Sequence, residues 1–252
     1  MRLAVISDIH GNLAALETVL ADIDRQGVDD LLCLGDLVGY GASPNEVIEI
    51  VRGRSIPTIM GNYDDGVGFD RDNCGCQYKD PRLEALGDQS LAWTKEHVPA
   101  ENKAYLRTLL PSIRRTIEGH EFLFVHGSPR KLNEYVYEDR PIETLERIAA
   151  SAKADVLVFG HTHLPYQKKV GSVLFVNTGT VGKPKDRDTR AGYVIFDILP
   201  QQVSVEFLRL PYDVEAAARA VETSGLPHEF AWQLREARGD LPTPEPANSP
   251  AR

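Results

Sequence analysis

Side chains that can bind metal ions follow the first apolar segment of the chain. Residues 3–6 are continuously apolar, and Asp8 and His10 come directly after them, two positions apart. Side chains at positions i and i+2 of an extended backbone point the same way, so this pair offers a carboxylate oxygen and an imidazole nitrogen to one ligand. An Asp-x-His pair is also typical of a helix cap beside a surface histidine. Alone it therefore indicates only half of a metal site.

The same arrangement recurs after four later apolar segments, at residues 31–34, 56–60, 121–125 and 156–159. The polar residues that follow these segments are Asp36, Asn62, His126, His161 and His163. The carboxyl ends of neighbouring parallel strands meet at one edge of a sheet, so we expect these side chains to converge with Asp8 and His10. Two divalent ions about 3.5–4 Å apart need a bridging carboxylate, and a central Asp36 could provide it.

Apolar periodicity predicts the elements that hold these side chains. Three strand–helix units are expected at the start of the chain, with strands at 3–6, 31–34 and 56–60, a helix from Leu13 that ends at Gly27, and a helix from Pro44 to Val51. A surface loop at 66–80 and two helices within 82–110, broken near Pro99, follow.

The second half of the chain is predicted to be richer in strands. Residues 113–117 and 121–125 form a hairpin, 142–152 a helix and 156–159 a strand. The segments 166–170, 173–176, 192–198 and 203–208 predict a second, mostly antiparallel sheet, and a helix is expected at 214–222.

Composition indicates one soluble globular domain over residues 1–240, followed by a disordered Pro-rich tail at 241–252. A net charge of -9 argues against a stable nucleic-acid complex. No segment resembles a membrane span or a signal peptide, so we expect the chain to reside in the cytoplasm. Cys33, Cys74 and Cys76 are interpreted as reduced thiols, because no further soft ligands for a structural zinc lie near the Cys74–Cys76 loop.

Taken in order, Asp8-x-His10, Gly35-Asp36, Gly61-Asn62, His126-Gly127 and Gly160-His161-Thr162-His163 resemble the calcineurin-like metallophosphoesterase superfamily, and its small bacterial phosphodiesterase branch most of all. The resemblance covers residues 1 to about 210. It implies an α/β fold: a four-layer α/β/β/α sandwich with two mixed sheets and a dinuclear metal site at the carboxyl ends of the strands. It also implies two divalent metal ions, manganese first, with iron, zinc, nickel, cobalt or magnesium as alternatives.

Residue by residue, the resemblance implies that Asp8, His10, Asp36 and His163 hold one metal and that Asp36, Asn62, His126 and His161 hold the other. A hydroxide that bridges the metals would attack phosphorus, with Asn62, Tyr63 and His126 assigned to catalysis. The implied reaction is hydrolysis of phosphate esters. A phosphodiesterase that acts on small or nucleotide esters is the first candidate, with 2′,3′-cyclic nucleotides among its possible substrates.

Two departures from the protein phosphatases of this superfamily narrow the function. Those enzymes carry Gly-Asp-x-Val-Asp-Arg-Gly and Gly-Asn-His, whereas Gly39, Tyr40 and Tyr63 stand here in place of the second Asp, the Arg and the His. This argues against a protein serine/threonine phosphatase. It leaves the acid that protonates the leaving oxygen open, because Tyr63 could donate that proton, stack on a nucleobase or only pack beside the neighbouring loop.

Several alternatives stay open at the level of sequence. A dinucleoside polyphosphatase, a phosphomonoesterase, or a non-catalytic interaction scaffold such as the metal-poor retromer subunit would share the fold. Arg130 and Lys183, or Lys185, are candidate contacts for the substrate phosphate. The expected partner is a small phosphate ester or nucleotide, and the chain could form oligomers.

Overall fold

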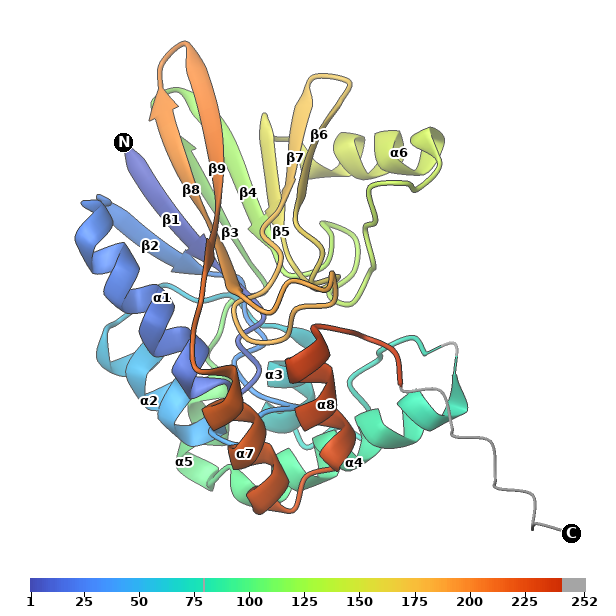
Figure 1. The fold of residues 1–252 in the computed structure, drawn as a ribbon. Helices are drawn as coiled ribbons and strands as arrows, with labels where there is room; N and C mark the ends of the chain where they lie inside the picture. The colour runs from blue at the N-terminus through green and yellow to red at the C-terminus, as the bar shows by residue number, and fades with distance from the viewer. Residues whose placement is uncertain (79, 242–252) are drawn as a thin grey trace, which may run out of the picture.

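The computed structural model describes residues 1–78 and 80–241. Two mixed β-sheets pack face to face (Figure 1). The first sheet has the order β2-β1-β8-β9 and comprises β1 (Arg2–Ile6), β2 (Asp30–Cys33), β8 (Ala191–Leu199) and β9 (Gln202–Leu210). The second has the order β3-β4-β5-β7-β6 and comprises β3 (Ser112–Ile117), β4 (His120–Val125), β5 (Val156–Phe159), β6 (Tyr166–Val170) and β7 (Val173–Asn177).

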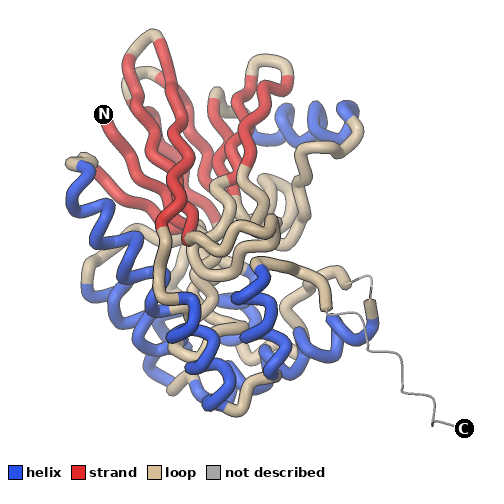
Figure 2. The backbone as a smooth tube through the Cα atoms, viewed as in Figure 1, coloured by secondary structure: helices blue, strands red, loops and turns tan. Residues whose placement is uncertain are grey.

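Helices cover the outer face of each sheet and one end of the sandwich (Figures 1 and 2). Helices α1 (Leu13–Gln26) and α2 (Pro44–Gly53) lie outside the first sheet, and α6 (Ile142–Ala152) lies outside the second. The remaining helices gather beyond the strand ends: α3 (Asn62–Gly68), α4 (Pro81–His97), α5 (Ala100–Leu106), α7 (Val214–Ser224) and α8 (His228–Glu236). None of the helices in the described ranges has the length and apolar character needed to cross a membrane.

Alternating side chains on the strands produce the four layers. On β1, Leu3 and Val5 join Phe122 and Phe124 in the apolar cluster between the two sheets. The intervening residues Ala4 and Ile6 face the other way and pack with apolar residues of α1 and α2. A third cluster lies between the second sheet and α6 and includes Leu157 and Ile148. The predicted α/β/β/α sandwich with two mixed sheets is therefore confirmed.

The predicted strand at residues 56–60 is wrong. The segment makes only two isolated bridges, from Cys33 to Thr58 and from Ile59 to Leu110. Pro57 has no backbone N–H to donate, and it interrupts the ladder in the middle of the apolar run. Its carbonyl accepts a hydrogen bond from the Cys33 amide at 2.9 Å, so the segment still lies beside β2.

The grouping of the last four strands also differs from the prediction. β6 and β7 join the second sheet as expected, but β8 pairs antiparallel with β1 and carries β9 into the first sheet. The first sheet is mixed as a result, with a parallel β1–β2 pair beside antiparallel strands. Helix α8 was not predicted, and the loop expected at 66–80 is helical up to Gly68. The predicted tail lies, apart from Leu241, outside the described residues.

Candidate metal centre

The predicted ligands come together where the strands end. Loops after β1, β2, β4 and β5, together with the first turn of α3, meet at this end of the sandwich (Figure 2). Five of the residues have backbone φ between 51° and 65°, in the left-handed region: Asp8, His10, Asp36, His161 and His163. Non-glycine residues there are strained by about 1 kcal/mol or more, and such strain clusters at functional sites. This end of the sheets is therefore held in an unusual backbone geometry.

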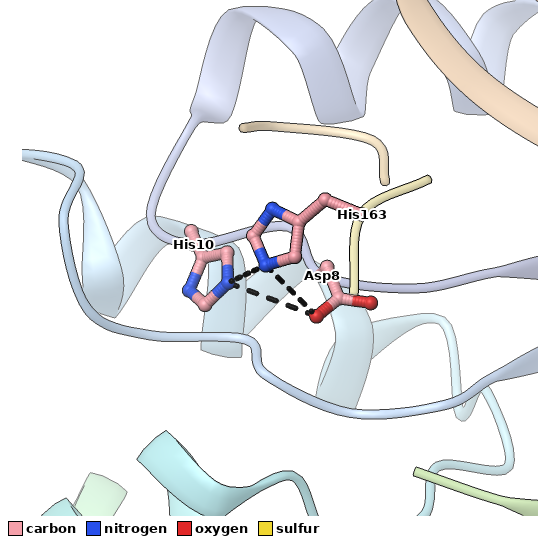
Figure 3. Close-up of side chains that lie close together, drawn as sticks. All are labelled: Asp8, His10 and His163. Carbon is pink, nitrogen blue, oxygen red and sulfur yellow. Dashed lines mark hydrogen bonds and ion pairs between the residues drawn. The ribbon is translucent and has the colours of Figure 1, made fainter. Parts of the chain in front are cut away.

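Asp8, His10 and His163 form one compact group, named site A (Figure 3). The His163 Nε2 atom lies 3.4 Å from Asp8 Oδ1, and the His10 Nε2 atom lies 3.8 Å from the same oxygen. The two Nε2 atoms are 3.3 Å apart. All three side chains are buried, so site A can hold one small ligand among three converging atoms.

Asp36, His126 and His161 form a second buried group, named site B. His126 Nε2 lies 3.4 Å from Asp36 Oδ2 and 3.2 Å from His161 Nδ1. The Asn62 side chain adds an oxygen, because its Oδ1 lies 3.1 Å from His126 Nε2. Two nitrogens and two oxygens therefore converge in site B.

Asp36 lies between the two sites. Its Oδ2 atom is 3.6 Å from His10 Nε2 in site A and 3.4 Å from His126 Nε2 in site B. Its other oxygen accepts a hydrogen bond from the Tyr63 amide at 2.8 Å, which fixes the carboxylate. A Cβ atom at Gly61 would collide with this carboxylate, so glycine is required at this position. One oxygen thus faces both sites.

Hydrogen bonding by the imidazoles tests whether these groups suit a cation. The Nδ1 atoms of His10, His126 and His163 lie 3.0, 2.9 and 2.6 Å from the carbonyl oxygens of Val38, Leu34 and Lys183, respectively. A carbonyl only accepts, so each Nδ1 carries a proton, and each ring in its neutral form turns a bare Nε2 toward the carboxylates.

One carboxylate oxygen in the centre lacks a donor as well. Asp8 Oδ1 is buried and has no hydrogen-bond partner among the described residues. His161 turns its Nδ1 atom toward site B, so the proton of its neutral ring is on Nε2, which has no acceptor among the same residues. Sites A and B therefore consist of lone pairs that face one another, an arrangement that a positive charge stabilises. Oxygen and imidazole donors of this kind fit divalent metal ions.

Charge and burial shift the pKa values of the centre when it holds no ion. Burial raises the pKa of Asp8 to about 6 and lowers that of His10 to about 4. Burial opposes the charge of His126, but the carboxylate of Asp36 outweighs it and raises the His126 pKa to about 10. The pKa of Asp36 is held below its usual value because His126 and His10 offset the effect of burial. When no ion is bound, a proton on His126 therefore supplies the positive charge beside Asp36.

Asp64 supports the centre and was not identified from the sequence. It is fully buried, and its carboxylate accepts hydrogen bonds from the backbone amides of Asp36, Leu37 and Gly61 at 2.8–2.9 Å. Burial, followed by the neighbouring charge of Asp36, raises the Asp64 pKa to about 7. Its position three residues after Gly61, in the first turn of α3, is the sequence signal for a carboxylate that caps a helix.

Tyr63 packs in an aromatic group rather than at an open surface. Its ring centroid is 5.5 Å from that of His10 and 4.7 Å from that of Tyr40. The side chain is 1% exposed, and its hydroxyl has no hydrogen-bond partner within the described chain. Gly39, at φ 89°, leaves space for the ring, because a Cβ atom there would overlap it.

Two of the predicted substrate contacts, Lys183 and Arg130, are engaged by protein groups. Lys183 is buried, and its Nζ atom donates to Gln233 Oε1 at 2.5 Å and lies 4.4 Å from the Tyr40 ring centroid. Arg130 donates to Glu134 through its Nε atom at 3.1 Å. Lys185 is close enough to Asp8 and Asp36 for their charges to offset part of the lowering of its pKa by burial.

A cavity of about 200 Å³ borders the centre on the His10 side. Apolar residues of α1, α7 and α8 form much of its wall, and His10, Tyr40 and Lys183 also line it. Space for an organic group therefore exists next to a site A residue.

The family model described as "Calcineurin-like phosphoesterase superfamily domain" matches residues 1–200. Protein MJ0912 of Methanocaldococcus jannaschii is 33% identical, over 92% of this chain and 96% of its own length. Phosphodiesterase YfcE of Escherichia coli K12 is 29% identical, over 73% of this chain and 82% of its own length.

Two solved structures have the same fold. A metallophosphoesterase from Sphaerobacter thermophilus is 31% identical, with a TM-score of 0.75 over 94% of this chain and 99% of that one. Protein PH1004 from Pyrococcus horikoshii is 24% identical, with a TM-score of 0.82 over 96% of this chain and 99% of that one. The chain therefore belongs to the calcineurin-like phosphoesterase superfamily and is a phosphoesterase.

Proposed function

We propose that this chain is a phosphodiesterase that uses two divalent metal ions to hydrolyse small phosphodiesters, nucleotide esters included. The observation that carries the proposal is the pair of acceptor-only sites joined by one oxygen of Asp36. Two divalent ions, when bound, polarise the phosphoryl oxygens and activate water for attack on phosphorus.

The proposed ligands follow from the two sites. Asp8, His10 and His163 would hold one ion in site A, and Asn62, His126 and His161 would hold the other in site B, with Asp36 shared. Carboxylate, amide and imidazole donors support manganese as the working metal, with iron, zinc, nickel, cobalt or magnesium as alternatives.

The chain's own residues orient these donors and limit access to them. The carbonyls of Val38, Leu34 and Lys183 fix the tautomers of three imidazoles, and the Tyr63 amide fixes Asp36. Burial of the ligands excludes bulk water, which strengthens electrostatic interactions with a phosphate in the site.

Three observations support a small diester over a phosphoprotein. Gly39 and Tyr40 occupy the positions where protein phosphatases of the superfamily carry Asp and Arg. The cavity beside His10 has room for an organic group of limited size. The relative YfcE is a phosphodiesterase. Cyclic 2′,3′-nucleotides are our first candidate substrates, and the cytoplasm is the proposed location.

A comparison of substrates tests the proposal. Purified protein loaded with Mn²⁺ is assayed with bis-p-nitrophenyl phosphate, p-nitrophenyl phosphate, 2′,3′-cyclic nucleotides and dinucleoside polyphosphates, and Asp36→Asn is the matched inactive control. We expect kcat/KM to be highest for a diester. A higher value for the monoester or for a dinucleoside polyphosphate would replace the proposal with the corresponding alternative. No turnover by protein that retains both ions would indicate an interaction scaffold.

A further inference from the structure

Cys74 and Cys76 form a close thiol pair in the loop that follows α3. Their Sγ atoms are 3.1 Å apart, and both side chains are partly exposed. Gly75 between them has φ 67°, a left-handed conformation that turns the chain and brings the two sulfurs to one side. The side-chain amide of Asn133 donates to the Gly75 carbonyl at 2.5 Å and holds this turn in place.

This thiol pair contacts site B through Asn62. The Asn62 Nδ2 atom donates to the Cys74 carbonyl at 3.1 Å and to Cys76 Sγ at 3.3 Å. The Oδ1 atom of the same amide faces His126 Nε2 at 3.1 Å. One planar group therefore connects the Cys76 sulfur and the Cys74 backbone to the metal centre, so a displacement of either of these changes the orientation of the Asn62 oxygen.

We propose that Cys74 and Cys76 form a reversible disulfide that lowers the activity of the metal centre by displacing Asn62. The inference rests on the proposed function for its effect on turnover. The formation of the disulfide does not depend on that function, because the geometry of the two thiols is independent of any substrate.

Peroxide is the proposed oxidant. One thiol attacks hydrogen peroxide, the O–O bond breaks, and a sulfenic acid and water form. The second thiol then attacks the sulfenic sulfur, an S–S bond forms, and a second water leaves. Both cysteines are oxidised and one peroxide is reduced to two waters, so atoms and electrons balance.

The disulfide requires a small movement and is expected to be readily reversed. A disulfide holds its sulfurs about 2.05 Å apart, so the pair must close by about 1 Å. A bridge across a single residue is restrained, and restrained disulfides are reduced more easily than relaxed ones. Movement of the Cys76 sulfur toward Cys74 would remove it from its contact with Asn62.

Thiol counting and intact mass test disulfide formation. The chain has three cysteines, and Cys33 is buried while the other two are accessible. After treatment with hydrogen peroxide or diamide, we expect two thiols to disappear and the mass to fall by two hydrogens. The peptide that contains both Cys74 and Cys76 should carry this loss of mass. Recovery of both thiols under these conditions would overturn the proposal.

Turnover with and without oxidant tests the effect on the centre. Loss of a group that orients a metal ligand typically lowers activity about 10–100-fold, and we expect a decrease of about 10-fold that dithiothreitol reverses. Cys74→Ser should be protected from diamide, because its remaining thiol at Cys76 lacks a partner. Cys33→Ala is the matched control, and it should be inactivated like the unmodified chain.

Two results would contradict the proposed switch. Unchanged turnover of protein shown to contain the disulfide would exclude an effect on Asn62. Equal losses in Cys74→Ser and in the unmodified chain would assign inactivation to another oxidation. If the reduced protein hydrolyses no phosphodiester, the proposed function fails, while the thiol count still decides whether the disulfide forms.

Discussion

Asp36 faces both metal sites, so its substitution can be compared with that of a ligand that faces only one site. Its Oδ2 atom faces His10 in site A and His126 in site B, whereas His163 faces only site A. A bridging oxygen needs a negative charge to hold two dications close together, and an amide provides none.

Asp36→Asn is therefore expected to lose both ions, and His163→Ala to lose mainly the ion of site A. Turnover should fall further in Asp36→Asn than in His163→Ala. The measurement is the bound metal per chain by elemental analysis, together with kcat under Mn²⁺. Two ions and near-normal turnover in Asp36→Asn would refute the bridge.

Tyr63 provides a second test at the level of one residue. Burial raises the pKa of its phenol well above 10, and a group this reluctant to ionise is a poor proton donor. The hydroxyl is also buried without a partner, so its removal costs no hydrogen bond.

We expect Tyr63→Phe to unfold at the same or a slightly higher urea concentration. Its kcat should fall by the same small fraction for nitrophenyl and ribosyl esters. A leaving-group series checks this: a loss confined to poor leaving groups would assign acid catalysis to Tyr63, and a higher KM for nucleotides alone would assign stacking.

A buried polar contact joins helix α1 to strand β8 of the first sheet. The Tyr193 hydroxyl on β8 donates to Asp22 Oδ2 on α1 at 2.6 Å. Asp22 is 9% exposed, and its pKa is lowered first by this hydrogen bond. A carboxyl whose pKa is depressed in the folded state stabilises the fold above its unfolded pKa, and this contribution is lost as the pH falls through the folded value.

Asp22→Asn should lower the free energy of unfolding at pH 7 by about 1–2 kcal/mol, because a hydrogen bond to a charged acceptor becomes neutral. The difference from the unmodified chain should be constant from pH 7 to pH 5 and shrink below about pH 4, where the unfolded carboxyl becomes protonated. Urea titrations across this range measure it, with Tyr193→Phe as the matched variant. A difference that persists undiminished at pH 3 would contradict the assignment.

Prediction from sequence succeeded where local pattern decides the element. Helix α1 begins after Asn12, whose side chain accepts from the Ala15 amide, and ends at Gly27 with φ 62°, as those residue types indicate. The strand-end motifs carried the resemblance to the family, and that resemblance implied the four-layer fold. Each motif, like each helix cap, is a pattern of residues close together in the chain.

Prediction failed where the partner of an element is distant. Periodicity identified β8 as a strand, but nothing local shows that it pairs with β1, since the paired positions Arg2 and Asp197 are 195 residues apart in the chain. In the same way, the roles of Lys183 and Asp64 depend on Gln233 and Asp36, which they meet only after folding. The Cys74–Cys76 contact with Asn62 also becomes visible only in three dimensions.

At the scale of the whole molecule, apolar packing and the metal centre are separate sources of stability. Three apolar clusters fill the interfaces of the four layers, and none of them needs an ion to form. The centre instead gathers five left-handed residues and buried acceptors at one end, and the burial of these acceptors costs free energy unless a cation is bound.

Chelation should therefore abolish hydrolysis while the chain still unfolds cooperatively, at a lower temperature. Ions present at about 100 times their dissociation constant stabilise a protein by about 2.7 kcal/mol per site, and this is the scale of the expected loss. Calorimetry with and without EDTA, followed by the return of turnover on adding Mn²⁺, measures both effects.

Asp36→Asn is the matched control, because a centre that already lacks its ions should show little shift in Tm with EDTA. Loss of the cooperative transition on chelation would mean that the metals hold the layers together and that the apolar interfaces alone are insufficient. Hydrolysis unaffected by the chelator would remove the metal ions from the reaction.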